Sequence, residues 1–72
     1  MKEPTLKDLR FAKRLKRLRK KADITQEQLA YKTKLSTTFI GLMEIGRRRP
    51  SIETLRRISS AMNIKMRELL ID

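Results

Sequence analysis

The side chains that most often carry out chemistry in enzymes are scarce in this sequence. Its 72 residues include neither Cys nor His, which removes the thiol nucleophile, the usual soft metal ligands and the proton shuttle that works at neutral pH. No nucleophile stands beside a base, no carboxylate pair has a catalytic spacing, and no glycine-rich loop could cradle a phosphate. The sequence therefore predicts a protein that is not an enzyme and uses no cofactor, metal ion or small-molecule ligand.

Basic side chains are abundant instead. The chain has 19 Lys and Arg residues against 8 Asp and Glu residues, a formal net charge of +11. This excess is far beyond what solubility requires in so short a chain, and it is typical of proteins that bind a polyanion. Nucleic acid ranks first among the candidates, ahead of an anionic membrane surface or an acidic protein.

The polar and basic residues that could bind an anion fall into three groups. Thr25 and Gln26 precede an apolar pattern, so they would stand at a helix N-terminus, where unpaired N–H groups and the helix dipole favour an anion. Arg47, Arg48 and Arg49 form a basic segment. The third group lies on one predicted helix: Lys13, Arg14, Lys16, Arg17 and Lys20. It either adds non-specific attraction or is a solvated helix face.

The elements that position these groups are all helical. Two Gly, two Pro and few clustered β-branched residues give too few turns for a β fold. With their caps, the predicted helices span about 10–21, 25–33, 36–44, 51–63 and 65–70. The chain is too short for two cores, so we assign residues 1–9 to an N-terminal extension and residues 10–72 to one domain.

The start of the first helix contains a conflict. Thr5 and Asp8 resemble a capping box that would begin this helix early. At 100° per residue, however, Leu6 and Leu9 would then face away from the apolar stripe of the remaining helix. We therefore expect the helix proper to begin near Arg10, while the preceding segment bends away or buries its leucines elsewhere.

The second and third helices are joined by a very short turn. Thr25 forms a capping box with Gln28, the helix runs to about Thr33, and Ser36 is the next N-cap. A turn of about three residues makes the next helix cross at a steep angle, which is typical of a helix-turn-helix. The outward positions of the third helix are Thr37, Thr38, Gly41 and Leu42.

Several short motifs occur together in one register. They are Thr25-Gln26-Glu27-Gln28-Leu29-Ala30, Leu35-Ser36, Ile40, Glu44-Ile45-Gly46 and Pro50-Ser51. Over roughly residues 11–70 the chain resembles the phage-repressor and Cro type helix-turn-helix (XRE) family. The resemblance implies an all-α, five-helix, lambda-repressor-like DNA-binding domain whose third helix, from Ser36 to Glu44, enters the major groove.

The resemblance also implies a function. It indicates a transcriptional regulator, usually a repressor, that binds double-stranded DNA sequence-specifically as a homodimer on a partly palindromic operator. Thr37, Thr38, Gly41 and Leu42 would contact base edges, and thymine methyl groups and DNA shape would supply part of the specificity. For Leu42 the alternative is a hydrophobic contact within the protein or between subunits. The expected phosphate contacts come from Thr25, Gln26, Lys34, Arg47, Arg48 and Arg49.

Two structural contacts are expected from the same resemblance. Arg19 and Glu44 occupy positions where this family often has an ion pair between the first helix and the end of the third. A dimer contact could come from either of two apolar groups: Leu69, Leu70 and Ile71, or Leu6 and Leu9.

Two residues depart from the family pattern. Lys34 stands where Gly is usual in the turn, so it must adopt a left-handed backbone conformation or the turn must differ. Lys65 stands where Ser or Thr usually caps the fifth helix, which makes that helix start less secure.

A second functional interpretation remains open at this point. The basic surface could serve a protein-interaction module, of antitoxin or coactivator type, against an acidic partner. No apolar run approaches the roughly 20 residues of a membrane span, and no signal-peptide core follows the charged start. We therefore expect a cytoplasmic protein without membrane contact, and the lack of Cys suits a reducing compartment.

Overall fold

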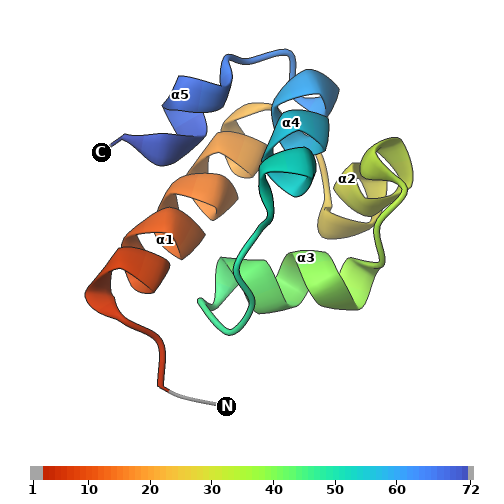
Figure 1. Ribbon diagram of the computed structural model, residues 1–72. Helices are drawn as coiled ribbons and strands as arrows, with labels where there is room; N and C mark the ends of the chain where they lie inside the picture. Colours follow the sequence, from red (N-terminus) through yellow and green to blue (C-terminus); the bar gives the residue numbers. More distant parts are fainter. Residues whose placement is uncertain (1–2, 72) are drawn as a thin grey trace.

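The computed structural model describes residues 3–71, and this part of the chain folds into five α-helices. They are α1 (Leu6–Lys21), α2 (Gln26–Thr33), α3 (Thr37–Glu44), α4 (Ile52–Ala61) and α5 (Met66–Leu70). The predicted all-α fold is thereby confirmed. Figure 1 shows α3 crossing below α1 and α4, with α2 beside α4 and α5 above α1. None of the helices in residues 3–71 is long and apolar enough to cross a membrane.

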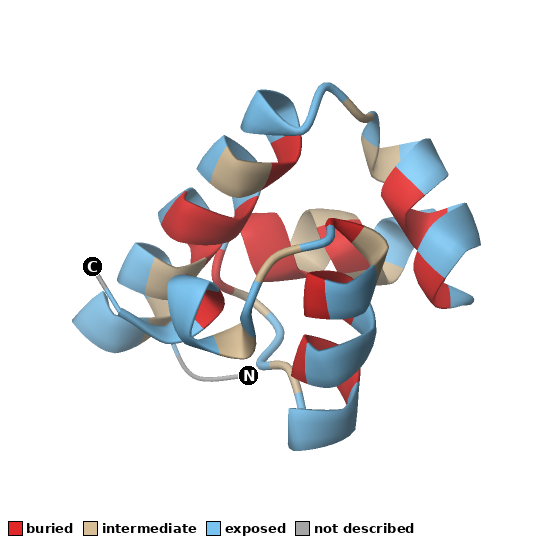
Figure 2. Cartoon of the chain, turned by 90° about the horizontal axis from the view of Figure 1, so that it is seen from above, coloured by how far each residue is buried: buried red, intermediate tan, exposed pale blue. Residues whose placement is uncertain are grey.

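All five helices contribute to one hydrophobic core. The largest completely buried side chains are Leu15 of α1, Leu29 of α2, Ile40 and Met43 of α3, Ile58 of α4 and Leu69 of α5. Figure 2 shows the buried residues on the sides of the helices that face one another, with exposed residues outside. Burial of each such side chain contributes about 1.5–3 kcal/mol. The core therefore fixes how α3 sits against its neighbours.

Side-chain caps set most of the helix starts. Thr5 and Thr25 form complete capping boxes, and Ser36 and Ser51 each accept a backbone N–H three residues further on. At α5 the side chain of the N-cap residue Lys65 makes no capping hydrogen bond. Each cap supplies a partner for an N–H group that has no acceptor within the helix, which stabilises the helix by about 1 kcal/mol.

The helix α1 begins at Leu6 rather than near Arg10. The Thr5 hydroxyl accepts the Asp8 N–H at 3.1 Å and the Asp8 carboxylate accepts the Thr5 N–H at 2.9 Å, so the early capping box forms. Leu6 and Leu9 remain 66% and 41% exposed. The segment thus neither bends away nor fully buries its leucines, because a capped, continuous helix gains one backbone hydrogen bond per residue and isolated exposed leucines are tolerated.

Arg14 does not belong to an exposed basic face, contrary to expectation. Its side chain is buried, and its Nη1 donates a hydrogen bond to the backbone oxygen of Leu69 at 2.7 Å. The helix α5 packs against this side of α1, so it covers a position that helical periodicity alone would leave to solvent. The remaining members of the group are exposed: Lys13, Lys16, Arg17 and Lys20.

Lys34 adopts the left-handed conformation that its position in the turn requires. Its φ and ψ angles are 60° and 34°, and it is the C-cap of α2. A side chain in this region of φ/ψ space costs about 1–2 kcal/mol relative to right-handed backbone. Lys34 therefore keeps the short turn between α2 and α3 at the expense of some stability.

Replacement of Lys34 by Gly should stabilise the fold. The variant relieves the left-handed strain, and part of that gain is offset by the greater freedom of Gly in the unfolded chain. We expect the free energy of unfolding to rise by about 0.5–1 kcal/mol, and the thermal midpoint by about 2–8 °C. As a control, Lys32→Gly in the helical part of α2 should lower the free energy of unfolding by about 1 kcal/mol. A midpoint for Lys34→Gly at or below that of the original chain would contradict this account.

Candidate nucleic-acid interface

The helix α3 has one buried side and one side open to solvent. Ile40 and Met43 are completely buried, and the Ser36 hydroxyl caps the helix by accepting the Phe39 N–H at 3.0 Å. The four residues expected to meet base edges lie outside this buried stripe: Thr37 and Thr38 are exposed, and Gly41 and Leu42 are half-buried. The helix therefore presents short hydroxyl, methyl and backbone groups to its surroundings.

A buried ion pair joins α1 to the end of α3. The Arg19 Nε and Nη2 atoms lie 2.7 Å and 3.0 Å from the two carboxylate oxygens of Glu44, and the side chains are only 9% and 2% exposed. Hydrogen bonding to Glu44 raises the pKa of Arg19. Arg19 also donates from Nη1 to the backbone oxygen of Ile24 at 2.8 Å, so the same guanidinium holds the turn before α2.

The side chain of Gln26 turns toward α3. Its Nε2 donates to the Glu44 carboxylate at 3.1 Å, and a Cβ placed on Gly41 would lie 3.8 Å from its Oε1. The sequence predicts Gln26 at a helix start with a phosphate contact, and it gives no sign of the contact to Glu44. No local pattern could have revealed it, since the two residues are 18 positions apart.

The N-terminus of α2 is partly closed by its own cap. The Thr25 N–H donates to the Gln28 side chain at 2.8 Å, and the Thr25 hydroxyl accepts the Gln28 N–H at 3.0 Å. An anion at this helix start would therefore meet the remaining N–H groups of the first turn and the amide of Gln26. Lys34 is exposed at the opposite end of α2.

The basic segment after α3 is held by acidic residues near the start of the chain. Arg49 Nε and Nη2 lie 2.8 Å and 3.3 Å from the two oxygens of Asp8, and Arg47 Nη2 lies 3.7 Å from the Glu3 carboxylate. The hydrogen bond from Arg49, followed by that from the Thr5 backbone, lowers the pKa of Asp8 from 3.8 to about 2. Asp8 is therefore ionised at neutral pH.

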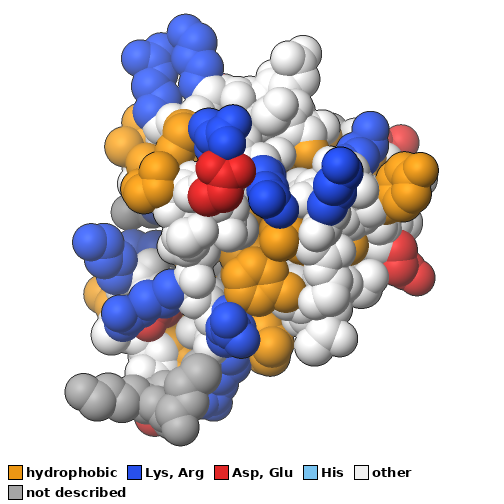
Figure 3. Space-filling model, turned by 45° about the vertical axis from the view of Figure 1, so that its right-hand side comes forward, with side chains coloured by type: hydrophobic (Ala, Val, Ile, Leu, Met, Phe, Trp, Pro, Cys, Tyr) orange, Lys and Arg blue, Asp and Glu red, His pale blue; other side chains and the backbone are white. Residues whose placement is uncertain are grey.

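Arg48 meets an aromatic ring rather than an acid. Its guanidinium carbon lies 5.1 Å from the centre of the Phe39 ring, within the range of a cation–π contact. Phe39 is half-buried and packs against the core. Figure 3 shows Lys and Arg side chains spread over one face of the molecule, with hydrophobic side chains between them.

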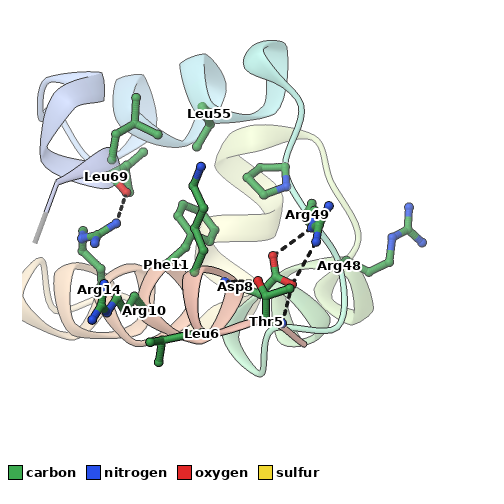
Figure 4. A pocket seen from close by; sticks show the side chains of 13 residues that line it. Thr5, Leu6, Asp8, Arg10, Phe11, Arg14, Arg48, Arg49, Leu55 and Leu69 are labelled. Atoms are coloured by element: carbon green, nitrogen blue, oxygen red, sulfur yellow. Dashed lines mark hydrogen bonds and ion pairs between the residues drawn. The ribbon is translucent and has the colours of Figure 1, made fainter. Parts of the chain in front are cut away.

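An apolar groove lies between α1 and α5. Its volume is about 810 Å³, and its apolar lining comprises Leu6, Phe11, Pro50, Leu55, Leu69 and Leu70. Figure 4 shows Phe11 between Leu55 and the first helix, with the Asp8–Arg49 pair at one end and the Arg14 contact to Leu69 at the other. The sequence gives no sign of this groove, because its lining comes from three separate parts of the chain: residues 5–14, 48–55 and 69–70.

The groove is lined by residues from both of the expected dimer surfaces, Leu6 from one and Leu69 and Leu70 from the other. Leu69 is completely buried, so it is not available for contact with another molecule. Leu6, Leu70 and Ile71 are 66%, 53% and 62% exposed, and Leu6 and Leu70 line the same groove. One exposed residue from each of the two predicted dimer contacts therefore lies at this groove. Among residues 3–71, no cluster of His, Cys, Asp and Glu could hold a metal ion.

Comparison with known proteins gives consistent matches. A family model described as helix-turn-helix (HTH_3) matches residues 15–69, which confirms the family resemblance. The control protein C.MunI of a Mycoplasma species is 38% identical over 65 residues, which cover 89% of this chain and 88% of that protein. The control protein C.BamHI of Bacillus amyloliquefaciens is 32% identical over 63 residues, which cover 86% of this chain and 78% of that protein.

A solved structure supports the same relationship. The crystal structure of the restriction-modification controller protein C.AhdI from Aeromonas hydrophila superposes with a TM-score of 0.84 at 32% sequence identity. The superposition covers 86% of this chain and 94% of that protein. The whole helical arrangement, rather than α2 and α3 alone, is therefore shared.

Removal of the Glu44 carboxylate should weaken both the fold and the interface. Glu44→Ala leaves Arg19 buried without its partner and releases Gln26, so we expect a loss of about 3–5 kcal/mol in the free energy of unfolding together with weaker DNA binding. Thermal melting and a duplex titration measure the two effects. The control Glu53→Ala removes an acid whose side chain is 51% exposed, and it should cost at most about 1 kcal/mol. Equal melting curves for the two variants would refute the structural role of Glu44.

Proposed function

The chain belongs to the HTH_3 helix-turn-helix family and is a DNA-binding transcriptional regulator, and we propose that it acts as a homodimer on a partly palindromic operator. We further propose that it controls the genes of a restriction-modification system in the cytoplasm. The control proteins C.MunI and C.BamHI and the restriction-modification controller C.AhdI, each at least 32% identical to this chain, support this role.

In the proposed complex, α3 lies in the major groove, which is wide enough to admit one helix. The observation that carries this pose is the two-sided character of α3, with Ile40 and Met43 in the core and Thr38 exposed. Thr37, Thr38, Gly41 and Leu42 then face base edges. Their hydroxyl and methyl groups offer no bidentate contact, so thymine methyl groups and DNA shape supply part of the specificity.

Phosphate contacts flank the reading helix in this pose. The start of α2, with Thr25 and Gln26, lies on one side of α3, and the basic segment of residues 47–49 follows its end. Lys34 adds a cation in the turn before α3. Gln26 is oriented by its hydrogen bond to Glu44, and Arg48 is oriented by its contact with the Phe39 ring. Because these two side chains are already ordered in the free protein, the entropy cost of binding DNA is reduced.

Salt dependence and sequence preference separate the two kinds of contact. If six to ten phosphates are contacted, affinity should fall by about 10³–10⁵ between 50 and 200 mM salt. Arg48→Gln should weaken binding to all duplexes and reduce the salt slope by about 1, whereas Thr38→Ala should reduce discrimination between operator and random duplex at an unchanged slope. Fluorescence anisotropy on operator and random duplexes measures both. A chain that binds neither duplex at low salt would instead be a protein-interaction module.

The proposed dimer forms through the apolar surface of Leu6, Leu70 and Ile71. Two reading helices about 34 Å apart would meet successive major grooves on one face of the duplex, and a single domain of this size buries too little surface for strong specificity. Leu6 and Leu70 line the groove between α1 and α5 and remain exposed to solvent, and the exposed Ile71 directly follows Leu70 at the end of α5.

Leu70→Glu should therefore separate the subunits. A charge inside the apolar contact is costly to desolvate, so we expect a monomer in sedimentation velocity and at least tenfold weaker operator binding, with random-duplex binding much less affected. Ile52→Glu makes the same change at a side chain on α4 that is 72% exposed, and that variant should remain dimeric. A Leu70→Glu variant that stays dimeric would place the contact elsewhere.

A further inference from the structure

The acidic residues near the start of the chain face the basic segment after α3. Glu3 and Asp8 are the only acidic residues among the first 22, and they contact Arg47 and Arg49 respectively. An acid placed at random along this region would meet the many cations of α1 itself. Both acids instead contact arginines of the segment that follows α3, which is distant in the sequence. We refer to residues 3–9 as the N-terminal brace.

Backbone packing joins the brace to the same segment. Gly46 is buried and has a φ of 82°, and a Cβ at this position would lie 3.1 Å from Leu9 Cδ2 and 3.3 Å from Pro4 Cβ. The brace therefore rests directly on the residue where the chain leaves α3. A side chain at this position would crowd Leu9 and Pro4 and would be strained at this φ, so glycine allows the brace and the segment after α3 to pack closely.

The contact between Asp8 and Arg49 orients the guanidinium without covering it. The bond uses Arg49 Nε and Nη2, and a guanidinium has five N–H donors, so the Nη1 end keeps donors for a second anion. The Arg49 side chain is 73% exposed while that of Asp8 is 14% exposed. The acid is thus enclosed by its partners, and the cation faces solvent.

We propose that Asp8 is a positioning residue for DNA binding, which holds Arg49 so that its outer edge meets a phosphate beside α3. This inference rests on the proposed function and deepens it, because it assigns a task in DNA binding to a residue that touches no DNA. The opposite relation would be masking, in which Asp8 neutralises Arg49 and DNA must displace it. Positioning and masking predict opposite signs for the loss of the Asp8 charge.

The test compares two variants of the full chain that each remove one acid from an arginine pair. Asp8→Asn keeps an oxygen that can accept the Thr5 N–H, so the helix cap is retained. Glu53→Gln is the matched control, since Glu53 on α4 binds Arg56 at 2.6 Å and Arg57 at 3.2 Å. Both variants gain one unit of positive charge, so non-specific attraction to DNA should rise similarly in both.

We expect Asp8→Asn to bind a random duplex about tenfold more weakly than Glu53→Gln at the same salt concentration, as coupling within a charged network allows. The expected loss disappears in an Arg49→Gln background, because Asp8 then has no guanidinium to orient. Tighter binding by Asp8→Asn would overturn the inference in favour of masking, and equal binding would overturn it by showing that Asp8 has no role in DNA binding. An equal loss in both backgrounds would assign the effect to the cap of α1 and overturn it as well.

Arg49→Gln by itself leaves the cap of α1 intact. It therefore tests the contact between Asp8 and Arg49 even if Asp8→Asn fails to fold. If Arg49→Gln changes neither affinity nor the salt slope, Arg49 makes no phosphate contact and the inference fails, while the proposed function stands. If the original chain does not bind duplex DNA at low salt, the proposed function itself fails. Thermal melting of each variant shows that the compared chains are folded at the temperature of the titration.

Discussion

Glu44 is almost completely buried, and its carboxylate binds side chains from two other helices. A carboxylate removed from water needs such partners, because the desolvation penalty exceeds what a single weak contact returns. Arg19 supplies two hydrogen bonds from α1, and Gln26 supplies one from the start of α2. These three helices therefore meet at one charged point beside the core, and the orientation of α3 depends on that point.

The second constraint on the interface comes from α1, which makes contacts along its whole length. This helix contacts the end of α3 through Arg19, the following segment through Asp8, and α5 through Arg14. It also provides one wall of the apolar groove that we assign to the dimer contact. A single long helix thus connects the reading helix, the basic segment and the proposed subunit contact. Leu6 of the proposed dimer contact and Asp8, which binds Arg49, lie within one turn of this helix.

Much of the fold could be predicted because its signals are local. Thr5, Thr25, Ser36 and Ser51 cap helices by contacts three residues away, and helical periodicity placed Thr37, Thr38, Gly41 and Leu42 outside the buried side of α3. The same periodicity failed at Arg14, where α5 covers a position that the pattern assigns to solvent. At the start of α1 the exposure of Leu6 argued against an early helix and the Thr5 cap argued for one. The prediction followed the first signal, whereas the structure follows the cap.

The sequence alone determined the all-α class, the family, most of the helix starts and the residues outside the buried side of α3, because caps and helical periodicity depend on neighbours within about one helical turn. Tertiary structure decided which partners the charged residues take. Gln26 with Glu44, Arg49 with Asp8 and Arg14 with Leu69 are 18, 41 and 55 positions apart. Such pairs form only after the core has brought distant helices together, because charge attracts any opposite charge within reach and packing alone selects which one is within reach.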